Sequence, residues 1–218
     1  MNIRVTEPAM RLEARCNPFS SARVRPAVMN YVHRADESTA DIVLQFEQQG
    51  SWGAIIGAHG SGKTTLLQTL VCQLDARDTP AFLLRIGPGG EFMLSNHEEM
   101  QDLPRGGVLA VDGYDELNWF RRWRLSRKCR RRGWGLLVTS HRDIRIPTLI
   151  RTSVSRMQAI TIVKELTEEW PVDWSVQAAR QVDSLLEEHD GNMREVLFAL
   201  YDRFDEFCRS EVGDIRVA

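Results

Sequence analysis

The segment GAHGSGKT at 57–64 has the residue types and the spacing needed to hold a phosphate chain. Its three glycines lack a Cβ, so the backbone N–H groups can turn inward around phosphate oxygens. Lys63 can reach the β- and γ-phosphates, and the Thr64 hydroxyl can ligate Mg²⁺. The predicted nucleotide-binding residues of this loop are Gly57, Ala58, His59, Gly60, Ser61, Gly62, Lys63, Thr64 and Thr65.

The neighbouring segments fit this interpretation of the loop. An apolar run, SWGAIIG at 51–57, precedes it and is typical of a buried strand, whereas TTLLQTLVCQL at 64–74 has the apolar spacing of a helix. A helix that starts directly after the loop aims its N-terminus at the bound anion. A metal-binding carboxylate is also required at the end of a neighbouring strand, and GVLAVDG at 107–113 supplies Asp112.

Short runs rich in Val, Ile and Leu alternate with longer helical segments as far as residue 166. This alternation predicts an α/β protein with a five-stranded, mainly parallel sheet between helices. Before the first strand, an amphipathic helix is expected to start at Asp36 or Ser38 and to stop at Gly50. The predicted strands are 51–57, 81–87, 107–113, 133–140 and 158–166.

The pattern changes after Leu166, where two amphipathic helical stretches, 174–190 and 192–208, flank Gly191. We therefore expect an N-terminal arm at 1–35, a core at 36–166 and a small helical domain at 167–218.

The composition, with 43% hydrophobic and 27% charged residues, is that of a globular protein with a packed core. The net charge of −2 creates no global attraction to nucleic acid or membrane. No apolar run approaches the ~20 residues needed to cross a bilayer, so no membrane insertion is expected. Four cysteines without a C-x-x-C pair favour a reducing, cytoplasmic setting over a zinc site or a disulfide framework.

Together with the phosphate loop, VLAVDGYDE at 108–116 resembles P-loop NTPases of the AAA+ and related STAND type. It looks like the Walker B element of NACHT-like members, in which the metal-binding Asp is followed by Gly, an apolar residue and two acids. The resemblance implies a three-layer core with a helical lid, in which Asp112 orients Mg²⁺ and Glu116 or Asp115 polarises the attacking water. In ordinary AAA+ proteins the catalytic Glu directly follows the Asp, but Gly113 stands here. Slow hydrolysis is therefore expected.

Two further regions are similar to sensor positions of this family. In LLVTSHRD at 136–143, Thr139 or Ser140 would contact the γ-phosphate or the water, and Arg142 would lie near the phosphate or face a neighbouring subunit. The alternative is a polar strand end that caps the next turn. In GNMREVL at 191–197, Arg194 would follow the γ-phosphate, and the alternative is a solvated side chain.

The family likeness also extends to the base. Several bacterial AAA proteins begin with Asn-Pro-Phe, so Pro18 and Phe19 would form walls of an adenine pocket or, alternatively, pack against the core. Adenine is favoured over guanine because no N/T-K-x-D motif follows the fourth predicted strand.

A basic stretch at 121–132 follows Glu116 closely and is interleaved with Trp119, Phe120 and Trp123. Three interpretations are open. The aromatic side chains face the sheet while the cations lie at a helix C-terminus; an arginine enters the nucleotide site of a neighbouring subunit; or the stretch binds a nucleic-acid backbone.

These residues and the resemblance predict an ATP-binding protein that hydrolyses Mg·ATP to drive a conformational or assembly change. It would act as a homo-oligomer or with a partner protein. The alternatives are a low-turnover, ATP-dependent switch that serves as an interaction module and a small-molecule kinase, for which no second substrate pocket signature is present. The predicted catalytic residues are Lys63, Asp115, Glu116, Ser140 and Arg142, the metal ligands are Thr64 and Asp112, and Arg194 joins the loop in binding nucleotide.

Overall fold

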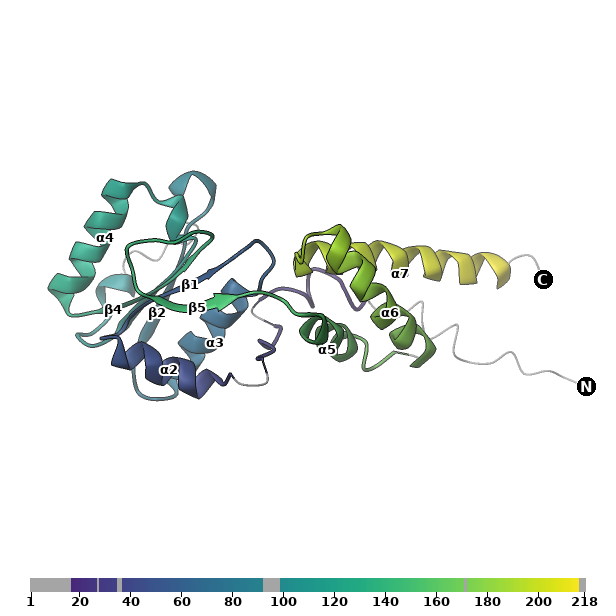
Figure 1. Cartoon of the computed structure of the whole chain (residues 1–218), viewed down its shortest axis with the longest axis horizontal. Coiled ribbons are helices and arrows are strands. Elements are labelled where there is room, and N and C mark those ends of the chain that lie inside the picture. Colours follow the sequence, from purple (N-terminus) through teal and green to yellow (C-terminus); the bar gives the residue numbers. More distant parts are fainter. Residues whose placement is uncertain (1–16, 27, 35–36, 92–98, 171, 216–218) are drawn as a thin grey trace, which may run out of the picture.

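The computed structural model describes residues 17–26, 28–34, 37–91, 99–170 and 172–215. These residues form a sheet with helices on both faces and, beside it, a group of helices from the C-terminal part of the chain (Figure 1). The strands are β1 (Trp52–Gly57), β2 (Ala81–Arg85), β3 (Val108–Asp112), β4 (Gly135–Ser140) and β5 (Thr148–Thr152). The helices are α2 (Thr39–Gln48), α3 (Lys63–Asp75), α4 (Trp119–Arg132), α5 (Arg156–Leu166), α6 (Val172–Glu188) and α7 (Met193–Ile215). Short 3₁₀ turns are η1 (Pro88–Gly90), η2 (Glu99–Gln101) and η3 (Tyr114–Glu116).

The sheet has five strands in the order β2-β3-β4-β1-β5, and every neighbouring pair is parallel. This confirms the predicted α/β class, and the sheet is parallel throughout. Because the strands are parallel, their carboxyl ends meet at one edge, where ligands bind in open sheets of this kind. The register brings the ends of β3 and β4 together, since Val111 pairs with Val138.

Alternation along the central strands creates the two faces of the core. On one face Leu109 and Leu136 share a buried cluster with Cys129 of α4. On the other face Ala110 and Leu137 pack in a second cluster with side chains of α2 and α3. The result is a three-layer sandwich, with α4 on one side of the sheet and α2 and α3 on the other (Figure 1).

Helix α2 confirms the helix expected before the first strand. The Ser38 side chain caps it by accepting a hydrogen bond from the Asp41 N–H, at 3.2 Å. Asp36, the other predicted cap, lies outside the described residues. Gly50 follows the helix with a φ of +74°, a conformation that glycine adopts without strain.

The prediction of a strand at 158–166 is wrong, because this segment belongs to α5. Its β-branched residues resemble a strand, but Ser155 and Gln158 form a capping box that starts a helix. The Gln158 N–H donates to Ser155 Oγ at 3.3 Å, and the Ser155 N–H donates to Gln158 Oε1 at 3.0 Å. Ala159 and Val163, four residues apart, then bury on one face.

The fifth strand is instead β5, which pairs with β1 at the edge of the sheet. Its sequence, TLIRT, mixes exposed and buried side chains and carries Arg151, so it lacks the continuous apolar run of the inner strands. An edge strand packs on fewer neighbours and therefore tolerates this polarity.

Helices α5, α6 and α7 share a hydrophobic cluster of their own. The rings of Trp170 and Trp174 each pack edge-on against Phe204, with centroid distances of 4.7 Å in both pairs. Phe19 from the N-terminal segment belongs to the same cluster. It is fully buried, and its ring centroid lies 5.7 Å from that of Trp174. The predicted boundary at residue 166 stays a prediction, and α5, just before it, packs with α6.

The part of the chain that the structure describes contains no helix that is both long enough and apolar enough to span a bilayer. The predicted cytoplasmic setting stays a prediction.

Candidate functional site

The loop between β1 and α3 has the backbone that a phosphate-binding turn requires. Gly60 and Gly62 adopt φ values of +67° and +86°, and Gly62 directly precedes α3. A Cβ on Gly57 would collide with the Thr152 hydroxyl of β5, so only glycine fits there. Three glycines thus allow the chain to leave β1, turn sharply and present the N-terminus of α3 at the carboxyl edge of the sheet.

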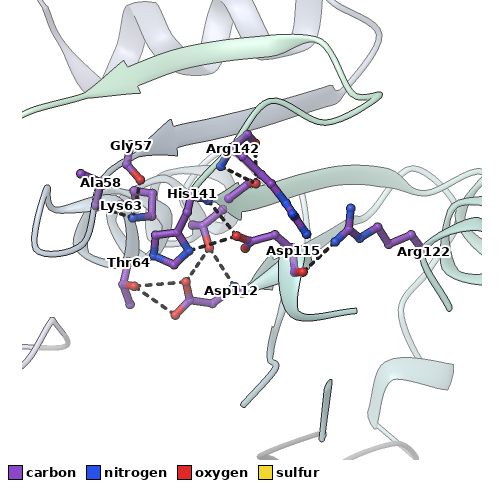
Figure 2. A network of polar contacts seen from close by, with 12 residues as sticks. Gly57, Ala58, Lys63, Thr64, Asp112, Asp115, Arg122, His141 and Arg142 are labelled. Atoms are coloured by element: carbon purple, nitrogen blue, oxygen red, sulfur yellow. Dashed lines mark hydrogen bonds and ion pairs between the residues drawn. The ribbon is translucent and has the colours of Figure 1, made fainter. Parts of the chain in front are cut away.

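Lys63 is the first residue of α3, and its side chain folds back over the loop (Figure 2). Its Nζ donates hydrogen bonds to the carbonyl oxygens of Gly57, at 2.8 Å, and Ala58, at 2.6 Å. Burial lowers the pKa of the Lys63 ammonium group, while the charges of Asp115 and Asp112 oppose this shift. A bound phosphate group would add negative charge beside this buried cation and would favour its charged form.

Asp112 at the end of β3 joins Thr64 and Thr139 in one polar network (Figure 2). The Thr64 hydroxyl donates to both carboxylate oxygens, each at 3.1 Å, and the Thr139 hydroxyl donates to Oδ1 at 2.7 Å. The Gly113 N–H donates to the Thr139 Oγ1 at 2.8 Å, which orients that hydroxyl. A carboxylate beside a hydroxyl is an oxygen-only donor set, which suits Mg²⁺ with water and phosphate as its remaining ligands.

The two acids that follow Gly113 differ in their surroundings. Asp115 Oδ2 accepts hydrogen bonds from the main-chain N–H and from Nδ1 of His141, both at 3.0 Å. Burial on its own raises the pKa of the Asp115 carboxyl, but the bonds from His141 outweigh it, and the pKa lies below its usual value. Glu116, by contrast, is exposed and lines the cavity in front of the loop.

His141 links this acid to the phosphate loop. Its ring lies against the ring of His59, with the centroids 3.9 Å apart and the planes tilted by 31°. His59 comes from the loop after β1 and His141 from the end of β4, two neighbouring strands. The pair therefore connects the two chain segments that border the expected position of the γ-phosphate.

These residues line a cavity of about 550 Å³. This volume is in the range of small-molecule sites. Its polar lining includes the loop with Asp112, Thr139 and Glu116. Its apolar lining comes mostly from the N-terminal segment, from α5 with the residues just before it, and from α7. The apolar lining residues include Val24, Met29, Val154, Ile162, Leu197 and Phe198.

The C-terminal helices reach the phosphate loop directly. A Cβ on Gly60 would overlap the Asn192 side chain, which precedes α7. Asn192 Oδ1 also accepts a hydrogen bond from the Arg194 N–H, at 3.2 Å, and so helps to start α7. The segment that starts α7 is therefore in contact with the glycine-rich loop at 57–64.

Replacing Gly60 with alanine should destabilise the protein for two separable reasons. The positive φ costs about 1–2 kcal/mol for a residue with a Cβ, and the methyl group would also displace Asn192. Gly50→Ala is the matched control, because Gly50 has a φ of +74° and no atom within 4 Å of its added Cβ.

In thermal unfolding, Gly60→Ala should lower the melting temperature more than Gly50→Ala. The additional loss should shrink when Asn192→Ala is introduced, because the overlap is then relieved. Equal losses in Gly60→Ala and Gly50→Ala would mean that the lid does not rest on this turn.

Of the remaining predicted site residues, some line the cavity and others lie outside it. Thr139 lines the cavity, whereas the buried Ser140 hydroxyl at the end of β4 donates to the Arg142 carbonyl in the following turn, at 2.6 Å. Arg142 is exposed and is absent from the described residues that line the cavity. Arg194 does line it, with its guanidinium 5.5 Å from the Phe198 ring centroid. Phe19 packs in the hydrophobic cluster of α5, α6 and α7 and is absent from the described residues that line the cavity.

Three contributions were missed by the sequence analysis. His141 was overlooked although it directly follows the predicted strand end. Gln158 was assigned to a strand, but its Nε2 donates to the Val32 carbonyl at 2.7 Å and ties α5 to the N-terminal segment. Tyr31 of that segment lies beside the loop, 3.3 Å from the position of a Cβ on Gly62. No local pattern marks such long-range contacts.

No protein-family model and no curated protein matches this chain. Among solved structures, the chain is similar to the AMPPCP-bound DnaA from Aquifex aeolicus, with 15% identity and a TM-score of 0.47. The match covers 80% of this chain and 62% of the DnaA chain, so it spans less than two thirds of DnaA.

Proposed function

We propose that the protein is an AAA-like P-loop NTPase that binds Mg·ATP in this cavity and hydrolyses it. The observation that carries the proposal is the meeting of Lys63, Thr64, Asp112 and Thr139 at the N-terminus of α3. A buried lysine, a helix N-terminus and an oxygen-only donor pair at one edge of a parallel sheet are together suited to a triphosphate with a divalent cation. The DGYDE motif further favours the NACHT-like, STAND type.

Each residue has a role that follows from its position. The backbone N–H groups of the loop and Lys63 hold the phosphates, and Thr64 and Asp112 would hold Mg²⁺, which supplies charge neutralisation when bound. Thr139 orients the Asp112 carboxylate through its 2.7 Å hydrogen bond. The apolar lining of the cavity is suited to a purine base, and adenine is proposed because the sequence has no N/T-K-x-D guanine-reading motif.

Glu116 is the better placed of the two acids to accept a proton from the attacking water. It lines the cavity, whereas both hydrogen bonds from His141 are directed at Asp115. The lowered pKa of Asp115 also makes that carboxylate a weaker base. We assign Asp115 and His141 as positioning residues for the loop that carries Glu116.

The alternative is an ATP-dependent switch with little turnover. It is favoured by Gly113, which separates Asp112 from the acids and puts Glu116 at the exposed end of the 3₁₀ turn η3. In that case ATP would mainly hold the lid helices against the loop. Contact between Asn192 and Gly60 provides the path for such a change.

The proposed ATPase would act as a homo-oligomer or with a partner protein. Arg142 supports this part of the proposal, since it is exposed at the end of β4 and outside the cavity of its own chain. An arginine in that position is available to a nucleotide bound by a neighbour, in the manner of an arginine finger.

Phosphate release from Mg·ATP, measured per protomer across rising protein concentration, tests the proposal. We expect release that stops when Mg²⁺ is chelated and that rises with concentration as shared sites assemble. A rate near zero with ATP still bound would support the switch instead. Failure to bind ATP in isothermal titration calorimetry would overturn both.

A further inference from the structure

Helix α4 carries a concentrated positive charge that the nucleotide site does not use. Eight of the 28 Lys and Arg residues of the chain lie within its 14 residues, and the helix contains no acid. Two of the eight are already hydrogen-bonded to neighbouring turns. Arg121 donates to the Gly90 carbonyl at 2.8 Å, and Arg122 donates to the Asp115 carbonyl at 2.6 Å. The remaining six cations are Arg124, Arg127, Lys128, Arg130, Arg131 and Arg132.

None of these six cations forms an ion pair with a carboxylate in the described part of the chain. Most lie over aromatic rings instead. Arg124 is 5.8 Å from the Phe120 centroid, and Arg127 is 5.2 Å from the Trp123 centroid. A guanidinium stacked on a ring keeps its N–H groups directed outward, where they can meet an anion.

The aromatic side chains at the start of α4 are exposed, which excludes the interpretation that they face the sheet. Trp119 is 77% exposed, Trp123 50% and Phe120 47%. The rings of Phe120 and Trp123 are nearly parallel, with 22° between their planes and 6.0 Å between their centroids. The buried contact of α4 with the sheet is made by Cys129 instead.

A groove runs along the same helix and is bordered by its cations. Its volume is about 770 Å³, and its apolar wall includes Leu84, Met100 and Leu117. Arg127 and Arg131 are among the residues on its basic side. In Figure 1, α4 lies at the end of the molecule opposite α6 and α7.

We propose that the exposed face of α4 binds single-stranded nucleic acid. Unpaired bases would stack on Trp119, Phe120 and Trp123, and the six cations would contact the phosphates. Exposed rings interleaved with arginine match both the bases and the phosphates of such a strand, whereas a duplex keeps its base faces stacked and covered. An acidic protein surface would match the cations but would not cover the three large exposed rings.

Fluorescence anisotropy of the full chain with labelled oligo(dT) and oligo(U) of about 16 nucleotides, a length suited to one binding module, tests the proposal. We expect binding at low ionic strength that weakens with salt. The slope of log K against log [salt] should be about −4 if each of the six cations neutralises one phosphate. Oligo(dT) and oligo(U) distinguish DNA from RNA as the source of the strand.

Single substitutions separate the contribution of base stacking to the affinity from the contribution of charge. Trp123→Leu should weaken binding by roughly tenfold or more, whereas Trp123→Phe, which keeps a ring, should stay close to the wild type. Arg127→Glu should weaken binding and reduce the salt slope, whereas Arg180→Glu, an exposed position on α6, should change neither. ATP-dependent thermal stabilisation of each variant reports that its fold is intact.

Three results would overturn the proposal. The first is no binding to either oligonucleotide at low ionic strength. The second is equal affinity for a duplex together with no effect of Trp123→Leu, which would mean attraction by charge alone. The third is displacement of oligo(dT) by polyglutamate as readily as by unlabelled oligo(dT), which would indicate an acidic protein partner.

Discussion

Replacing Lys63 with alanine is expected to abolish the thermal stabilisation that Mg·ATP gives the folded protein. In the wild type, ATP at ~100 times its Kd should stabilise the fold by about 2.7 kcal/mol. That gain corresponds to a rise in melting temperature of roughly 5–10 °C for a chain of this size. The variant loses the only lysine of the loop, whose Nζ reaches the Gly57 and Ala58 carbonyls.

Differential scanning fluorimetry with and without Mg·ATP measures this effect. Arg77→Ala is the matched control, because it removes a cation just after the other end of α3, where its nearest acid is Glu47 at 4.0 Å. The control should keep the full ATP-dependent shift. If Lys63→Ala also keeps it, the cavity described above is not the nucleotide site.

Glu116→Gln is expected to lower phosphate release by roughly a hundredfold or more, the usual contribution of a general base. ATP binding should persist, because the amide retains the size of the side chain and Lys63, Thr64 and Asp112 are unchanged. Release measured under single-turnover conditions separates this loss from slow product release.

Asp115→Asn distinguishes the two acids in the same assay. It should lower release less than Glu116→Gln, because Asp115 acts through its contacts with His141 and not on water. Glu187→Gln, exposed on α6, should leave the rate unchanged. A loss confined to Asp115→Asn would reverse the two roles.

The inner part of the fold was predictable because its strands are continuous apolar runs with clear ends. β1, β3 and β4 lie within the predicted ranges, and each is buried along most of its length. The edge strand β5 escaped prediction because it is only partly buried and includes the exposed Arg151. Helix α5 was mistaken for a strand because β-branched content was weighed above the Ser155 and Gln158 capping signal.

The candidate site, like the fold, could be predicted from the sequence only in part. Contacts within the loop and at the end of β3 follow from spacing, so Lys63, Thr64 and Asp112 were found from the sequence and lie together in the structure. The stacking of His59 on His141 joins residues 82 positions apart, the difference of their numbers, and depends on how the ends of β1 and β4 meet. Contacts of this kind require the fold and leave no local pattern.

The short connection between the turn η3, which carries Glu116, and helix α4 has a thermodynamic consequence. Arg122 of α4 donates to the Asp115 carbonyl, and the Tyr114 hydroxyl lies 3.1 Å from Ser126 Oγ. These contacts tie η3 to α4, so a shift of one is expected to move the other. Any factor by which ATP changes the affinity of α4 for a strand is then the factor by which the strand changes the affinity for ATP. A polymer bound on one side of the sheet would therefore act as an effector of the chemistry at its edge, and the nucleotide would in turn set how long the polymer stays.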